Sequence, residues 1–142
     1  MKNNEMYLEF DSNSANEAFA RVAVAAFVAQ LNPTLEEIAD IKTAVSEAVT
    51  NCIVHAYPNE IGLVSIRCRI LKDHTLDIVI KDKGVGIADI EQARRPMYTT
   101  GGDDRSGMGF TIMESFMTNF SVTSKLGKGT SVHMRRKLQK RK

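Results

Sequence analysis

Hydrophobic residues between Thr34 and Tyr57 recur at steps of three and four residues, the period that places side chains on one side of an α-helix. The helix is predicted to begin at Thr34, because a threonine followed three residues later by Glu37 is typical of a reciprocal N-terminal cap. Pro33 cannot continue an earlier helix. The predicted apolar side consists of Ile38, Ile41, Val45, Ala48, Val49, Cys52 and Ala56.

Two more segments have the helical period. Ser14, followed by Glu17, has a second capping-box pattern and predicts a helix that runs to about Gln30. Another helix is predicted to open at Gly107. Ala18, Val22, Ala25 and Ala29 share one side of the former, and Ile112, Met113, Phe116, Met117 and Phe120 face inward from the latter.

Five segments alternate between apolar and polar residues, which is the period of a half-buried β-strand. Alternation of this kind favours an antiparallel sheet with one covered face. With the helices on that face, the pattern predicts a two-layer α/β sandwich whose sheet is mixed and mostly antiparallel. The predicted strands are 6–10, 64–70, 76–80, 121–126 and 130–137, with turns at 72–74 and 127–129.

The composition is that of an ordinary globular protein. Its 142 residues, 43% hydrophobic and 25% charged, are expected to form one domain that spans 1–142. We expect a cytoplasmic protein, since there is no apolar run of membrane-spanning length and no signal-type leader. Cys52 and Cys68 fall on apolar stripes and are expected to be core thiols.

The net charge is only +2, so the basic residues by themselves do not indicate a nucleic-acid partner. Basic residues crowd into 135–142, a run that would suit phosphate or an acidic protein but that we interpret as a frayed, solvated tail. Arg21 is the lone cation of a helix rich in alanine and valine. We hypothesise that it marks a docking surface for a protein partner.

A polar stripe runs beside the apolar side of the Thr34 helix. Glu47, Asn51 and His55 are each four residues apart, so their side chains stack one turn above the other. The carboxamide oxygen of Asn51 is a suitable Mg²⁺ ligand, and Glu47 would then lie within reach of a nucleophile that approaches a terminal phosphate. Taken alone, the stripe also fits a solvated polar face.

Two glycine-rich turns follow in the order that a phosphate site needs. Asp82 ends a strand before two glycines and is suited to accept a hydrogen bond from a flat ligand such as adenine. The segment from about 89 to 106 has no clear period and is predicted to be a lid. It leads to Gly107 and Gly109, where free helix amides would suit phosphate, with Arg105 and Ser106 just upstream as a cation and a hydroxyl.

Four motifs give these residues a family resemblance. The stretch SEAVTNCIVHAY (46–57) resembles the N box of the gyrase, Hsp90, histidine kinase and MutL ATPase superfamily. DKGVG (82–86) and RSGMGF (105–110) resemble its two glycine boxes, and GKGT (127–130) its final turn. The motifs stand in family order over nearly the whole chain. Within the superfamily, the chain resembles the bacterial anti-sigma serine kinases of the sporulation anti-sigma F type, which implies a Bergerat-type ATP-binding fold.

The resemblance assigns roles to individual positions. It implies Glu47 as the catalytic carboxylate, Asn51 as the Mg²⁺ ligand and Asp82 as the residue that reads adenine. His55 occupies a position where the family varies, and we expect it at the edge of the pocket without a chemical role. The resemblance also implies Gly84 and Gly86 at the adenine pocket, Gly107, Met108, Gly109 and Phe110 along the phosphates, Thr130 beside Asp82, and Thr99, Thr100 and Arg105 in the lid.

What the family does is implied by the resemblance alone. It implies ATP and Mg²⁺ as cofactors, phosphorylation of a serine on an anti-anti-sigma protein, and retention of a sporulation sigma factor of the sigma F type. It also implies a homodimer, with no direct nucleic-acid or membrane partner. Two alternatives stay open: a nucleotide-gated sigma-binding module with little kinase activity, and the ATP domain of a sensor histidine kinase.

Overall fold

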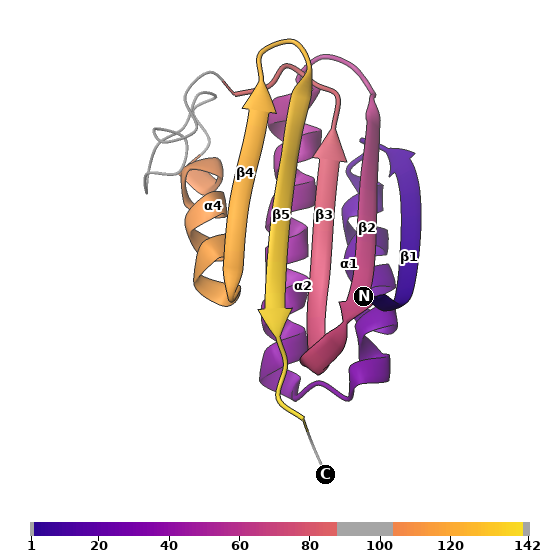
Figure 1. Cartoon of the computed structure of the whole chain (residues 1–142). Helices are drawn as coiled ribbons and strands as arrows, with labels where there is room; N and C mark the ends of the chain where they lie inside the picture. Colours follow the sequence, from indigo (N-terminus) through magenta and orange to yellow (C-terminus); the bar gives the residue numbers. More distant parts are fainter. Residues whose placement is uncertain (1, 88–103, 141–142) are drawn as a thin grey trace.

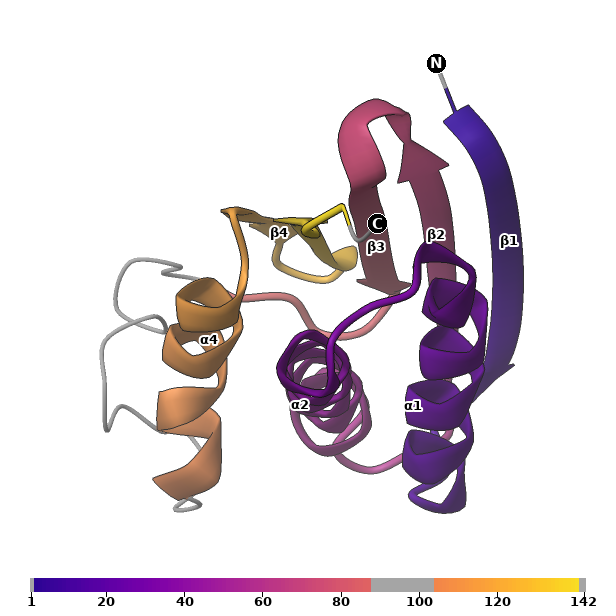
Figure 2. The ribbon, with the colours of Figure 1, turned by 90° about the horizontal axis from the view of Figure 1, so that it is seen from below.

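The computed structural model describes residues 2–87 and 104–140. Three α-helices lie against one face of a five-stranded sheet, with α2 between α1 and α4 and in contact with both (Figures 1 and 2). The predicted two-layer sandwich is therefore confirmed. The elements are β1 (Lys2–Asp11), α1 (Ala15–Val28), η1 (Ala29–Leu31), α2 (Leu35–Asn51), η2 (Cys52–Ala56), β2 (Leu63–Leu71), η3 (Lys72–His74), β3 (Thr75–Asp82), α4 (Asp104–Phe116), β4 (Asn119–Lys125) and β5 (Gly129–Lys137).

The strand order is β1-β2-β3-β5-β4, and every described pairing is antiparallel. Alternate residues of the central strands enter the core, which explains why their sequences alternate. Two neighbouring residues with positive φ, Asp73 and His74, make the predicted turn between β2 and β3. No helix in the described part of the chain is both long enough and apolar enough to span a bilayer.

The cap predicted at the start of α2 is confirmed. The Thr34 hydroxyl accepts a hydrogen bond from the Glu37 amide at 3.0 Å, and the Glu37 carboxylate accepts one from the Thr34 amide at 2.8 Å. The predicted apolar side is buried in the core from Ile41 to Ala56, and both cysteines are buried free thiols as expected. After Asn51 the helix widens into η2, one turn of π-helix.

Two predictions for α1 are wrong. Ser14 forms no side-chain cap, because its own backbone is helical; the Glu17 amide donates to the Ser14 backbone carbonyl oxygen at 3.3 Å, and the Asn13 side-chain oxygen Oδ1 accepts from the Ala15 amide at 2.9 Å. The buried side is also a different one. Apolar residues surround this helix, so periodicity does not select a face. The core contains Ala20, Val24 and Val28, whereas Ala18, Val22 and Ala29 are exposed and Ala25 is half-buried.

The frayed tail is wrong for residues 135–138. Strand β5 continues to Lys137, and Leu138 is buried. The Arg136 guanidinium donates to Asp40 at 2.9 Å and to the Phe116 carbonyl oxygen at 2.7 Å, so it links β5 to α2 and to the end of α4. These basic side chains are therefore structural, because acceptors from other elements meet them.

A buried charge cluster on the open face of the sheet, the face opposite the helices, was not predicted. Asp77 is fully buried although its side chain lies on this face. It accepts hydrogen bonds from Arg69 on β2 and from His133 and Arg135 on β5, which cover it. Burial by itself raises the pKa of Asp77, but these hydrogen bonds outweigh burial and hold the pKa below its ordinary value.

Candidate functional site

Glu47 and Asn51 point from α2 toward α4. A Cβ atom placed on Gly109 would lie 3.3 Å from Asn51 Nδ2, 3.5 Å from Asn51 Oδ1 and 3.4 Å from Glu47 Oε2. The absence of a side chain at Gly109 therefore lets a carboxylate and a carboxamide approach the backbone of α4. Mg²⁺ commonly takes few oxygen ligands from the protein and several from phosphate or water. The side-chain oxygens of Glu47 and Asn51 near Gly109 fit this preference.

Asp82, the last residue of β3, is held by three elements. Its Oδ1 accepts from the Gly84 amide at 2.9 Å and from the Thr130 amide of β5 at 3.2 Å, while the Cys52 sulfur of η2 lies 3.5 Å from Oδ2. Burial raises the pKa of Asp82, and the hydrogen bonds from Gly84, Cys52 and Thr130 offset this only in part. The buried carboxylate is thus fixed in place and can accept a further donor at Oδ2.

The first glycine box packs against two neighbouring segments. A Cβ on Gly84 would overlap the carbonyl oxygen of Ala56, which already accepts from the Val85 amide at 2.9 Å. Gly86 has a φ of +79°, and a Cβ there would overlap the Lys125 carbonyl oxygen at the end of β4. Only glycine allows this loop to lie between η2 and the β4–β5 turn.

Two hydroxyl residues that the sequence reasoning missed hold this corner together. The Tyr57 hydroxyl donates to the Leu63 carbonyl oxygen and accepts from the Lys83 amide, both at 2.7 Å. The Ser124 hydroxyl lies 2.8 Å from the Thr130 hydroxyl and accepts from the Ile87 amide at 2.8 Å. Tyr57 closes the N-box motif, but its hydroxyl meets residues further along the chain, so only the folded structure shows these contacts.

Comparisons with known proteins identify the family of this chain. Residues 10–136 match the histidine kinase-like ATPase domain family. The anti-sigma F factor of Caldanaerobacter subterraneus subsp. tengcongensis is 59% identical over 93% of this chain and 92% of that protein. The anti-sigma F factor of Geobacillus kaustophilus is 54% identical over 98% of this chain and 96% of that protein. The chain belongs to the anti-sigma F factor family.

Solved structures share the fold at low sequence identity. The RsbU and RsbW domains of Rv1364c from Mycobacterium tuberculosis match with a TM-score of 0.71 at 17% identity, over 96% of this chain and 33% of that one. The mycobacterial sensor histidine kinase MprB matches with a TM-score of 0.60 at 14% identity, over 96% of this chain and all of that one. At this low identity, the two structures show only that this anti-sigma F family member shares their fold.

The second glycine box was predicted to open a helix, but in this family member it lies inside helix α4. Helix α4 begins at Asp104, so Gly107 and Gly109 lie inside its first two turns and not at its start. The physical reason is that an aspartate such as Asp104 favours a helix N-terminus, whereas glycine is a poor indicator of a helix start. The side chains of Arg105, Ser106 and Met108, together with Thr99, Thr100 and most of the predicted lid, lie outside the described residues, while Phe110 is buried in the core.

Arg21 is not the isolated cation that the sequence indicated. Its Nη1 donates to Glu17 Oε2 at 3.1 Å and to the Ser46 hydroxyl oxygen at 3.3 Å, and the Ser46 hydroxyl donates to the same Glu17 oxygen at 2.9 Å. The Arg21 side chain is 36% exposed. In this anti-sigma F family member, the cluster therefore connects the surface of α1 to Ser46, the residue that precedes Glu47 on α2.

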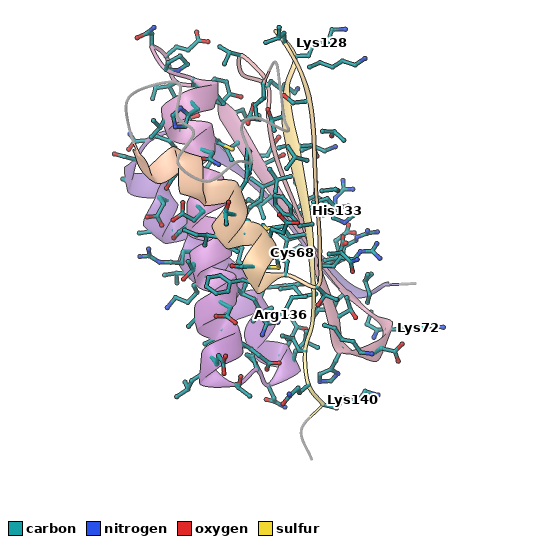
Figure 3. All side chains as sticks on the ribbon, turned by 90° about the vertical axis from the view of Figure 1, so that its left-hand side faces the viewer. Cys68, Lys72, Lys128, His133, Arg136 and Lys140 are labelled. Atoms are coloured by element: carbon teal, nitrogen blue, oxygen red, sulfur yellow. The ribbon has the colours of Figure 1, made fainter. Side chains whose placement is uncertain are left out.

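A groove of about 540 Å³ lies on the open face of the sheet, near the end where Lys128 projects (Figure 3). The residues that line it include Tyr7 and Glu9 of β1, Lys81 and Asp82 of β3, and Thr130 of β5. Glu47 and Asn51 do not line it. The groove is therefore separate from the carboxylate and carboxamide that face α4.

Proposed function

We propose that this chain binds Mg-ATP between α2, α4 and the end of β3, and that it transfers the γ-phosphoryl group to a serine of an anti-anti-sigma protein. One observation carries the proposal: consecutive residues of one helical segment face both halves of a nucleotide site. Asn51 faces Gly109 on α4, and Cys52 contacts Asp82 on β3. The family membership supports ATP as the nucleotide.

Each residue has a distinct task in this reaction. Asp82 Oδ2 accepts from the 6-amino group of adenine, and Asn51 Oδ1 holds Mg²⁺, which when bound neutralises charge on the phosphate oxygens. Glu47 orients the serine hydroxyl and takes its proton. As the serine oxygen forms its bond to the γ-phosphorus, the bond from that phosphorus to the bridging oxygen breaks; the bridging oxygen keeps the bonding electron pair and leaves as part of ADP.

The partners of this chain follow from the same proposal. Relatives that match nearly the whole chain are named anti-sigma F factors, so we propose that this chain holds a sigma factor of that type away from RNA polymerase, as a homodimer. Arg21 is proposed as a partner contact, because its guanidinium is partly exposed beside the exposed side of α1, where Phe19 and Val22 are 54% and 59% exposed.

Label transfer from radiolabelled ATP to the cognate anti-anti-sigma protein tests the kinase. Glu47→Gln keeps the shape of the side chain but cannot take a proton, so we expect transfer to fall by about a hundredfold or more while ATP still binds. Glu36→Gln, at an exposed position of the same helix, is the matched control and should transfer at the wild-type rate. ATP binding without transfer in the wild type would favour the sigma-binding module instead.

A further inference from the structure

Cys52 is a buried residue of the site for which the proposed reaction gives no role. It is the first residue of η2 and is 4% exposed. Its sulfur lies 3.5 Å from Asp82 Oδ2, within the range of a thiol-to-carboxylate hydrogen bond. A cysteine thiol is mostly protonated at neutral pH, so the Cys52 thiol donates to the Asp82 carboxylate.

The two oxygens of Asp82 have different surroundings. Oδ1 accepts two backbone amides, from Gly84 and Thr130. In the part of the chain that the structure describes, the donor at Oδ2 is the Cys52 thiol. A carboxylate oxygen has two lone pairs, and a thiol is a weak donor. Oδ2 therefore keeps the capacity to accept a stronger donor in addition to the thiol.

We propose that Cys52 is a positioning residue for purine selection: its thiol fixes Asp82 so that Oδ2 faces the 6-amino group of adenine. The inference rests on the proposed nucleotide function. Two amides hold Oδ1, and the thiol restrains the remaining twist of the carboxylate through the other oxygen, Oδ2. A weak donor suits this task, because it orients Oδ2 without competing strongly with the amino group.

A second buried thiol gives a matched control. Cys68, on β2 (Figure 3), is fully buried in the core between the sheet and the helices. Loss of either sulfur leaves a similar small cavity and destabilises the fold by the same mechanism. Only Cys52 contacts Asp82 among the cysteines, so the two Cys→Ala variants separate positioning from packing.

The experiment is calorimetric titration of the full chain with Mg-ATP and with Mg-ITP, which carries a 6-oxo group in place of the 6-amino group. In Cys52→Ala, we expect the affinity for ATP to fall about fivefold, the value of one modest hydrogen bond, and the affinity for ITP to stay within about twofold. Cys52→Ser restores a donor and should recover most of the ATP affinity. Cys68→Ala should bind both nucleotides as the wild type does.

Several results would overturn this inference. If Cys52→Ala binds ATP with the wild-type affinity, Cys52 has no role in nucleotide binding. If its affinities for ATP and ITP fall equally, Cys52 acts through packing alone. Should Cys52→Ala fail to fold, Cys52→Val fills the space of the thiol without a donor and carries the same expectation. A wild-type protein that binds no ATP would overturn the proposed function itself, a result that is distinct from wild-type binding with a silent Cys52.

Discussion

Gly109→Ala is expected to stabilise the fold and to impair phosphoryl transfer. Gly109 lies within α4, where replacement of glycine by alanine favours the helix by about 0.8–1.0 kcal/mol. The new Cβ would lie 3.3 Å from Asn51 Nδ2 and 3.4 Å from Glu47 Oε2. Both atoms are at the ends of side chains, which can move by a few tenths of an ångström at small cost.

The displacement is small for the fold and large for the chemistry. A shift of about 1 Å in a reacting group can cost about a hundredfold in rate, so a few tenths of an ångström should cost about tenfold. The gain in stability, reduced by the crowding, should raise the melting temperature by about 2–4 °C. The two effects therefore have opposite signs in one variant.

Thermal unfolding and single-turnover label transfer measure the two effects on the same preparation. Ser115→Ala is the control, because it is an exposed residue of the same helix and should raise stability without slowing transfer. A Gly109→Ala protein that is more stable and transfers at the wild-type rate would show that this face of α4 does not border the reacting phosphate. That result would refute the placement of the site.

Three further outcomes are expected. Asn51→Ala should abolish the Mg²⁺-dependent part of ATP affinity. The circular dichroism of the helices should be retained, since alanine is tolerated in a helix. An ATP affinity equal to that of the wild type would remove Asn51 from the site. Asp77→Asn should lower the free energy of unfolding in urea at pH 7 by about 3 kcal/mol, because Arg69, Arg135 and His133 lose a buried partner. The folded-state pKa of Asp77 is depressed below the ordinary 3.8. The wild-type advantage should therefore be complete above about pH 5 and shrink as the pH falls below 3.8 toward the folded pKa; an advantage that grows as the pH falls below 3.8 would contradict the assignment. Arg21→Ala should weaken binding of the sigma factor about tenfold or more without changing ATP affinity, and a calorimetric titration that gives wild-type sigma affinity would discard Arg21 as a contact.

Sequence patterns predicted the structure correctly where the residues that contact each other lie within one short segment. Thr34 and Glu37 satisfy each other's amides within one turn, so their cap could be predicted from spacing. The same pattern at Ser14 failed, because the backbone of Ser14 is itself helical and the Glu17 amide donates to the Ser14 backbone carbonyl oxygen in place of its hydroxyl. For α1, which is apolar on several sides, only contact with the sheet and α2 selected Val24 over Val22 as the buried valine.

The sequence by itself determined the layers of the fold, the stripe of Glu47 and Asn51 beside a buried helix face, and the order of the motifs. These depend on period and on near neighbours, whose geometry is fixed by the backbone. Only the tertiary structure decided that Cys52 meets Asp82, and that Asp77 is buried under residues from two other strands. Such contacts join residues far apart in the chain, and their register follows from how the whole sheet and its helices pack.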